Sequence, residues 1–325
     1  MKTCRRRCGR CIRRSISTAA PTIRRHCPIA SSTFDLMALL RRVSERLRRP
    51  QGVPWRSAGL VAETLSADEA VRSTGWVFDN RTGDGVSLAS FVASGDDEVR
   101  RYLKTFGFAR GSTDALTMVE IGSGIGRMTA AFTRAFGVVY AADVDAAFLE
   151  RCRETVFHHG EPTRLRTVHV ADGRTLDLPN ASVDFSFSYI TLQHCNSDDA
   201  HALVREALRV TKPGGLIALN FRTWTRADAA LVPLGGVVRL LWRMPKVAKY
   251  MARVRPLTRL GWQANRLSPD DVLAGLGTDL VGTSLREVTL LHSPRRKLRV
   301  GLTGVRRIAV RRINRSHWWL VARLA

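Results

Sequence analysis

The chain has 325 residues, 45% of them hydrophobic, and a formal net charge of +24. This length is ample for one sizeable core, and no apolar run approaches the roughly 20 residues needed to cross a membrane. The positive charge is concentrated at the two ends of the chain. Residues 1–50 hold 14 Lys and Arg against two acidic residues, and residues 291–325 hold 10 Lys and Arg against no acidic residue. Residues 51–290 are nearly neutral, with 28 Lys and Arg against 26 acidic residues. Basic ends attract phosphate nonspecifically, so we predict no specific nucleic-acid partner.

Residues 1–36 are predicted to be a disordered basic segment, because Arg is dense and no apolar period is sustained. The segment holds four cysteines at positions 4, 8, 11 and 27, but their spacing fits no standard zinc ligand set and the intervening Arg residues repel a cation. Two interpretations stay open: an organelle transit peptide, or upstream sequence ahead of a true start at Met37. We favour the second, since an amphipathic helix pattern opens at Met37 and the composition suggests a GC-rich bacterial genome.

Residues 37–110 are predicted to be a helical lead-in. A capping box at residues 66–69 opens a short helix, and a second helix is expected over about residues 94–106. Trp76 and Phe78 are expected to anchor the lead-in on the following domain or over its crevice.

The stretch Thr117–Thr129, T-M-V-E-I-G-S-G-I-G-R-M-T, organises the rest of the chain. A short apolar run with one acid, Glu120, leads into three glycines and then an amphipathic helix pattern, which is the first half of a βαβ unit. Glycines allow a tight turn and close approach of a ligand, and the helix start offers unpaired N–H groups to a negative group. A nicotinamide-binding turn reads G-x-G-x-x-G, whereas this turn reads G-x-G-x-G.

Further apolar segments then alternate with helix patterns. They cover residues 138–142 before Asp143, residues 168–171 before Asp172, residues 183–189, and residues 216–220 after a helix from about Asp198 to Val210. This alternation predicts a doubly wound, mostly parallel α/β sheet. The carboxyl ends of adjacent parallel strands face one crevice, so Asp143 is expected beside the glycine turn. Asp145 is expected to cap the helix that starts near Ala146.

Together these segments resemble the class I S-adenosylmethionine (SAM) methyltransferases. The resemblance covers roughly residues 96–220 and includes S-Y-I-T-L-Q-H and R-E-A-L-R-V-T-K-P-G-G-L around strands four and five. It implies a seven-stranded sheet and SAM as cofactor, with Asp143 on the ribose, Asp172 on the adenine, and Glu120 orienting the turn or binding the amino group. Taken alone, Asp172 also fits an ordinary Asp-Gly turn. The candidate cofactor-binding residues are Glu120, Gly122, Ser123, Gly124, Gly126, Asp143, Val144, Asp172, Gly173 and Tyr189.

His194, just past strand four, is the candidate catalytic residue. Methyl transfer from a sulfonium is an in-line displacement in which positioning supplies much of the rate, and a hydroxyl acceptor also needs a general base. Histidine titrates near neutral pH, and this one lies at the edge of the sheet where the methyl would point. The alternative is a histidine that only packs or hydrogen-bonds the loop. Tyr189 and Gln193 are expected to orient the acceptor or the cofactor, and the scheme requires no metal.

The predicted methyltransferase domain, residues 111–325, carries a helical insertion at residues 222–266. Residues 231–251 are apolar and basic together, Pro245 is expected to split them into two short helices, and the resemblance implies a cap over the acceptor. A helix from Ser268 and an antiparallel pair of strands at 285–291 and 318–324 complete the sheet. The basic connection 295–315 has apolar residues at near-helical spacing. Residues 231–251 and 295–315 are candidates for peripheral contact with an anionic membrane, or are simply solvated.

The sequence therefore predicts a cytoplasmic, bacterial SAM-dependent methyltransferase that acts on a small molecule, with a hydroxyl of a sugar, polyketide or lipid-linked metabolite favoured. Few cysteines in the core favour a reduced compartment. Two alternatives are an RNA or protein methyltransferase that docks through its basic ends, and a non-catalytic SAM-binding module. The sequence indicates neither the methylated atom nor the oligomeric state.

Overall fold

The computed structural model describes residues 53–79, 85–109, 111–241, 265–276, 285–296, 298, 300–301 and 304–325, with residues 244, 247 and 260. The predictions for residues 1–36, for the start at Met37 and for a helix break at Pro245 lie outside these residues. The described part belongs to one compact unit that spans Leu47–Ala325. No helix among the described residues is long and apolar enough to cross a membrane.

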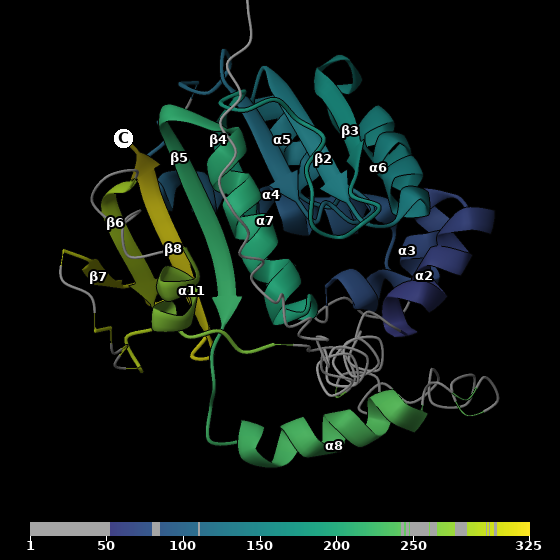
Figure 1. Cartoon of the computed structure of the whole chain (residues 1–325). Coiled ribbons are helices and arrows are strands. Elements are labelled where there is room, and N and C mark those ends of the chain that lie inside the picture. The colour runs from purple at the N-terminus through teal and green to yellow at the C-terminus, as the bar shows by residue number, and fades with distance from the viewer. Residues whose placement is uncertain are drawn as a thin grey trace, which may run out of the picture. The chain divides into compact units, whose positions relative to one another are not determined.

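A mixed sheet forms the centre of the described part (Figure 1). Its strand order is β3-β2-β1-β4-β5-β8-β6-β7. The strands are β1 (Thr117–Ile121), β2 (Val138–Asp143), β3 (Leu165–His169), β4 (Val183–Ser188), β5 (Thr211–Arg222), β6 (Leu285–His292), β7 (Arg306–Ala309) and β8 (His317–Leu324). The first five strands pair in parallel, and β8 inserts antiparallel between β5 and β6. The α/β class and its mostly parallel sheet are as predicted.

The sheet has eight strands and not the predicted seven, because the basic connection 295–315 contributes β7. Strand β7 pairs in parallel with β6 at the edge of the sheet, and all four of its residues are exposed. The near-helical spacing of apolar residues in the connection was therefore misleading. A spacing pattern predicts a helix only where one face can be buried, and this segment instead satisfies its backbone by pairing with a neighbouring strand.

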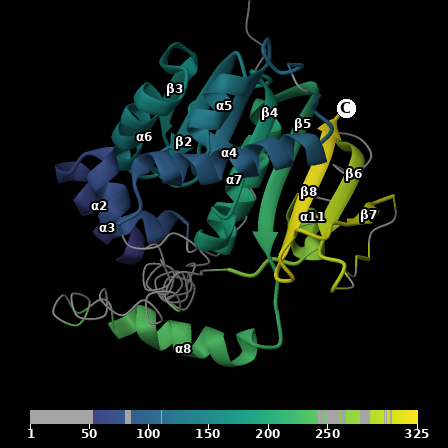
Figure 2. The same ribbon diagram turned by 180° about the vertical axis from the view of Figure 1, so that it is seen from behind.

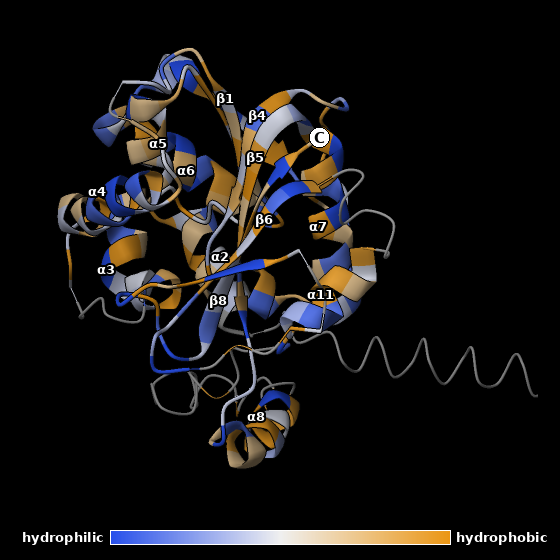
Figure 3. Cartoon of the chain, turned by 90° about the vertical axis from the view of Figure 1, so that its left-hand side faces the viewer, coloured by the Kyte–Doolittle hydropathy of each residue, from blue (hydrophilic) through white to orange (hydrophobic). Residues whose placement is uncertain are grey.

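Helices cover both faces of the sheet (Figures 1 and 2). On one face lie α4 (Leu88–Thr105), α5 (Thr129–Ala135) and α6 (Ala146–His159), and on the other α7 (Ser197–Val210) and α11 (Pro269–Leu276). Successive residues of β1 pack against the helices on opposite faces of the sheet. Met118 packs in a cluster with Val99 of α4, whereas Val119 packs in a cluster with Leu203 of α7. Figure 3 shows the apolar strands enclosed between these helices.

The lead-in forms α2 (Val53–Thr64), α3 (Ala67–Phe78) and α4. Ser66 and Glu69 make the predicted capping box at α3, and Asp145 caps α6 as predicted. The prediction that the next helix starts near Ser94 is wrong, since α4 begins at Leu88 with Ser87 as its cap. The insertion contains α8 (Asp228–Leu241), which includes Pro233.

Candidate functional site

The glycine turn is bent back tightly between β1 and α5. Gly122 has a φ of +84°, and its N–H donates to the carbonyl of Ala142 at 2.7 Å. A Cβ at this position would overlap the side chain of Thr191. Only glycine meets both conditions without strain, so the first glycine of the turn allows β1 and the loop after β4 to approach each other.

Asp143 binds this turn from the end of β2. Its Oδ2 accepts a hydrogen bond from the N–H of Gly124 at 2.8 Å, and its Oδ1 accepts one from the N–H of Asp145 at 3.1 Å. Burial raises the pKa of Asp143 to about 6, although these hydrogen bonds oppose the shift. Each oxygen of a carboxylate can accept more than one hydrogen bond, so the carboxylate can hold the turn and still accept bonds from a ligand.

Glu120 is the second buried acid of the turn. Its Oε2 accepts a hydrogen bond from Thr129 Oγ1 at 2.6 Å, and the residue is only 4% exposed. Burial raises its pKa to about 8, against the opposing hydrogen bond from Thr129 and the charge of Arg127. Two desolvated carboxyl groups on one cavity wall favour a ligand that brings positive charge.

A cavity of about 1050 Å³ opens beside the turn. Eight of the eleven predicted site residues line it: Glu120, Gly122, Ser123, Gly124, Asp143, Val144, Tyr189 and His194. Gly126 does not line the cavity; it supports the turn from behind, because a Cβ there would press on the backbone of Cys152.

Asp172 and Gly173 are not brought to the cavity. Asp172 is exposed, and its carboxylate accepts hydrogen bonds from the N–H groups of Arg174 and Thr175 and from Thr175 Oγ1. These bonds lower the pKa of Asp172, the one from the Thr175 side chain most. These contacts are those of an ordinary Asp-Gly turn, which was the alternative interpretation of Asp172 in the sequence analysis.

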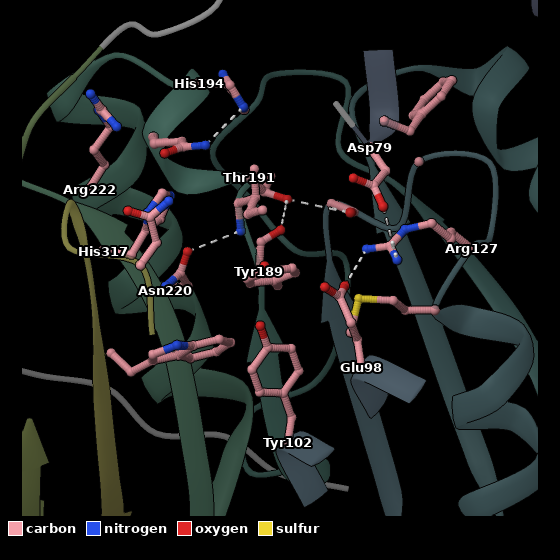
Figure 4. Close-up of a pocket in the computed structure, with 18 of the residues that line it drawn as sticks. Asp79, Glu98, Tyr102, Arg127, Tyr189, Thr191, His194, Asn220, Arg222 and His317 are labelled. Atoms are coloured by element: carbon pink, nitrogen blue, oxygen red, sulfur yellow. Dashed lines mark hydrogen bonds and ion pairs between the residues drawn. The ribbon is translucent and has the colours of Figure 1, made fainter. Parts of the chain in front are cut away.

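A buried ion pair that the sequence analysis did not predict lies on the glycine-turn side of the cavity (Figure 4). Arg127 Nη2 lies 2.7 Å from Glu98 Oε2, and Arg127 Nη1 lies 3.8 Å from Asp79 Oδ2. The Glu98 side chain is 3% exposed and that of Arg127 10%. One signal was present in the sequence: Glu98 falls on the same helical stripe as Phe91 and Tyr102, where an acid requires a partner.

The loop after β4 forms the opposite wall. Ile190 has a φ of +61°, a conformation that is a genuine outlier for a β-branched residue and is typical of functional sites. Its N–H donates to Asn220 Oδ1 at 3.3 Å, and Thr191 Oγ1 donates to the carbonyl of Tyr189 at 3.2 Å. The strained loop is thus fixed between β1 and β5 and points Tyr189 and Thr191 into the cavity.

His194 lies in this wall and is 9% exposed. Its Nε2 is 3.2 Å from Gln193 Nε2, and its ring meets the ring of Trp55 edge-on at 5.1 Å. The Trp55 contact shows that α2 reaches the cavity. Gln193 Oε1 is buried and has no hydrogen-bond partner in the part of the chain that the structure describes, which makes it available to a ligand.

Asn220, Arg222 and His317 complete the wall on the side of β5 and β8 (Figure 4). The sequence analysis did not predict these residues. Arg222 and His317 are 95 positions apart and become direct neighbours only through the antiparallel pairing of β5 with β8. Among the described residues, no three His, Cys, Asp or Glu side chains gather closely enough to hold a metal ion.

Comparison with known proteins adds four findings to this geometry. A family model described as a methyltransferase domain matches residues 119–219. The ubiquinone/menaquinone biosynthesis C-methyltransferase UbiE of Vibrio cholerae is 28% identical over 224 residues, which cover 66% of this chain and 81% of the Vibrio protein. An uncharacterized methyltransferase of Mycobacterium sp. (strain KMS) is 33% identical over 121 residues, 37% of this chain and 42% of that protein. Among solved structures, the magnesium protoporphyrin IX methyltransferase of Synechocystis with bound S-adenosylhomocysteine (SAH) aligns with a TM-score of 0.46 and 16% identity over 79% of this chain and 98% of that one.

Proposed function

The chain belongs to the class I SAM-dependent methyltransferases, and we propose that it transfers the methyl group to a hydroxyl of a small-molecule acceptor. One observation carries the proposal: a single cavity joins the glycine turn and Asp143 at one end to His194, Tyr189 and Asn220 at the other. Cofactor and acceptor can therefore meet in one enclosed space, as an in-line displacement requires.

The residues of the turn fit SAM. Ser123 Oγ is buried and lacks a hydrogen-bond partner within the described residues, and the buried Glu120 and the half-buried Asp143 set two carboxyl groups against the ligand. SAM supplies positive charge on its sulfonium and ammonium groups and an electrophilic methyl. We propose that Asp143 binds the ribose hydroxyls and that Glu120 and Ser123 bind the amino-acid end.

In the proposed reaction the acceptor oxygen forms a bond to the methyl carbon, the carbon–sulfur bond breaks with its electron pair on sulfur, and the hydroxyl proton passes to His194. Gln193 Nε2 can only donate, so its 3.2 Å contact makes His194 Nε2 the unprotonated ring nitrogen. This nitrogen takes the proton when the acceptor hydroxyl replaces the Gln193 amide, and Trp55 packs edge-on against the ring. A base positioned in this way contributes about 10²- to 10⁴-fold to the rate.

The test is methyl transfer from labelled SAM to a panel of small alcohols and phenols. His194→Gln is expected to lower kcat by about 100-fold or more without changing the affinity for SAH. His201→Gln is the matched control, because His201 lies on α7 outside the cavity and contacts the carbonyl of Asp271. Equal turnover in wild type and His194→Gln would remove the base assignment and leave His194 as a packing residue.

Carbon methylation is the second candidate, and the similarity to the Vibrio C-methyltransferase favours it. A quinol or phenol in the panel separates the two, since product analysis distinguishes a new ether from a ring methyl. Methyl transfer only to ring carbon would replace the hydroxyl proposal while keeping the cofactor assignment.

The insertion is proposed to act as a cap with an apolar surface that also contacts a membrane. Leu234, Val237 and Leu240 of α8 are 49%, 53% and 61% exposed, and Figure 3 shows the apolar residues along this helix. Sedimentation with vesicles of phosphatidylglycerol and phosphatidylcholine tests the contact. A Val237→Ser/Leu240→Ser variant is expected to lose it, and unchanged binding of this variant would overturn it.

A further inference from the structure

The acids that line the cavity are sorted by position. All five, Asp79, Glu98, Glu120, Asp143 and Asp145, lie before residue 146, on the side of the glycine turn, which also carries Arg101 and Arg127. The lining residues from Tyr189 onward include no acid but five arginines, at positions 222, 295, 311, 312 and 315. The acceptor half of the cavity therefore has an excess of positive charge.

Arg222 is the buried member of this group. Its side chain is 12% exposed, Nη1 donates to Ser316 Oγ at 2.9 Å, and Nη2 lies 3.0 Å from Asp228 Oδ1. Arg266 lies 3.1 Å from the same oxygen, so one carboxylate serves two guanidinium groups. Arg222 Nε has no hydrogen-bond partner in the described part of the chain.

His317 adds a second buried polar group without a full set of partners. Its Nε2 has no hydrogen-bond partner among the described residues. Burial lowers the pKa of His317 to about 4, and the charge of Arg222 contributes, so the ring is neutral at physiological pH. The pKa of Arg296, which lies next to Arg295, is also lowered, by burial and then by the charge of Arg315.

We propose that the acceptor carries a phosphoryl group, held by Arg222, Arg295 and Arg315, with its methylated end toward Tyr189 and His194. This inference rests on the proposed function. Guanidinium groups match the oxygens of phosphate in paired hydrogen bonds, and several arginines with one shared carboxylate suit a dianion better than a neutral sugar or polyketide. His317 Nε2 and Arg222 Nε are the buried groups that such a ligand satisfies.

The experiment titrates phenyl phosphate into the full chain saturated with SAH, at an ionic strength of about 0.15 M to screen distant charges. The pocket variant is Arg295→Gln/Arg315→Gln. The matched control is Arg306→Gln/Arg307→Gln, which removes the same charge from the exposed edge strand β7 outside the cavity. All four arginines are exposed, so neither variant should impair folding.

We expect the pocket variant to bind phenyl phosphate about tenfold more weakly or worse, the edge variant to bind within about twofold of wild type, and both to keep their SAH affinity. Equal losses in the two variants would show a nonspecific charge effect and overturn the proposal. Malonate, a dicarboxylate dianion, binding as tightly as phenyl phosphate would overturn the phosphoryl assignment.

Two further outcomes separate the sources of failure. Binding to phosphatidylglycerol vesicles that the pocket variant loses, with no binding of phenyl phosphate, would assign the arginines to a lipid surface and overturn the acceptor proposal. Normal SAH binding without phenyl phosphate binding refutes this inference alone, whereas absent SAH binding refutes the proposed function itself.

Discussion

The backbone N–H of Gly124 donates a hydrogen bond to Asp143 Oδ2 at 2.8 Å. This bond joins the loop after β1 to the end of β2, and it places the carboxylate beside the glycine turn in the same cavity wall. The acid thus holds the turn in its bent shape, and we propose that it also presents oxygen acceptors to the cofactor.

Gly122→Ala is expected to destabilise the fold and abolish SAH binding. An added Cβ meets Thr191, and the φ of +84° costs a non-glycine residue about 1–2 kcal/mol by itself. Gly107→Ala isolates the second effect, because Gly107 has a φ of +87° and nothing within 4 Å of an added Cβ. Urea unfolding should show a clearly larger loss for Gly122→Ala than for Gly107→Ala. Equal losses would mean that the contact with Thr191 is unimportant.

The pKa of Glu120 gives stability a defined dependence on pH. Its folded pKa of about 8 lies above its ordinary value of 4.5 because of burial, so the folded state binds the proton more tightly than the unfolded state. The stability that this provides is complete below pH 4.5 and is lost as the pH rises through about 8. Glu120→Gln, which removes the titration, should gain roughly 4 kcal/mol relative to wild type between pH 5 and pH 9.

Urea unfolding of the ligand-free protein at both pH values measures this change. The change in unfolding free energy between pH 5 and pH 9 is measured for each protein, and the two changes are compared. The general effect of the high net charge is common to both proteins and cancels. Parallel pH profiles for wild type and Glu120→Gln would contradict a buried, proton-binding Glu120.

The buried Arg127–Glu98 pair should be far more important for stability than the exposed Arg134–Asp96 pair. Arg127→Met removes the nearer cation of the buried Glu98, whose other cation, Arg101, lies 3.7 Å from Oε1, and is expected to cost about 3 kcal/mol. Arg134→Met is the control, because Arg134 pairs with Asp96 where both side chains are more than 30% exposed; it should cost at most about 1 kcal/mol. Chemical denaturation compares them, and similar losses would contradict the difference in burial as the cause.

Asp172→Asn tests which acid serves the cofactor. Asp172 lies outside the cavity and binds its own turn, so the variant should keep its SAH affinity within about twofold and lose only about 1 kcal/mol of stability. Calorimetric titration of SAH gives the first quantity. A tenfold weaker affinity would restore the adenine-binding role implied by the resemblance.

The sequence predicted the parts of the site that follow from local chemistry and strand order. The acid before the glycine turn, Asp143 at the end of β2 and the capping residues of α3 and α6 all lie where they were expected. These features depend on neighbours along the chain or on the rule that parallel strands end at one edge.

The errors have physical causes too. A helix was expected to start near residue 94, but α4 begins at Leu88 and runs through Gly95. A Cβ at Gly95 would meet the carbonyl of Arg127, so this glycine allows close packing inside a helix. The arginines of residues 295–315 were predicted to contact an anionic membrane or to be simply solvated. Their place in the cavity depends on how β6 and β8 return the chain to β5, which no local pattern shows.

The most direct test of the account is calorimetric titration of SAH into the wild-type protein and into Asp143→Ala. The account predicts saturable binding by wild type and at least about tenfold weaker binding by the variant, because the variant loses both the ribose acceptor and the bond to Gly124. Circular dichroism must show that both proteins are folded. Folded wild-type protein that does not bind SAH, or a folded variant that binds it equally well, would contradict the placement of the cofactor at the glycine turn and Asp143.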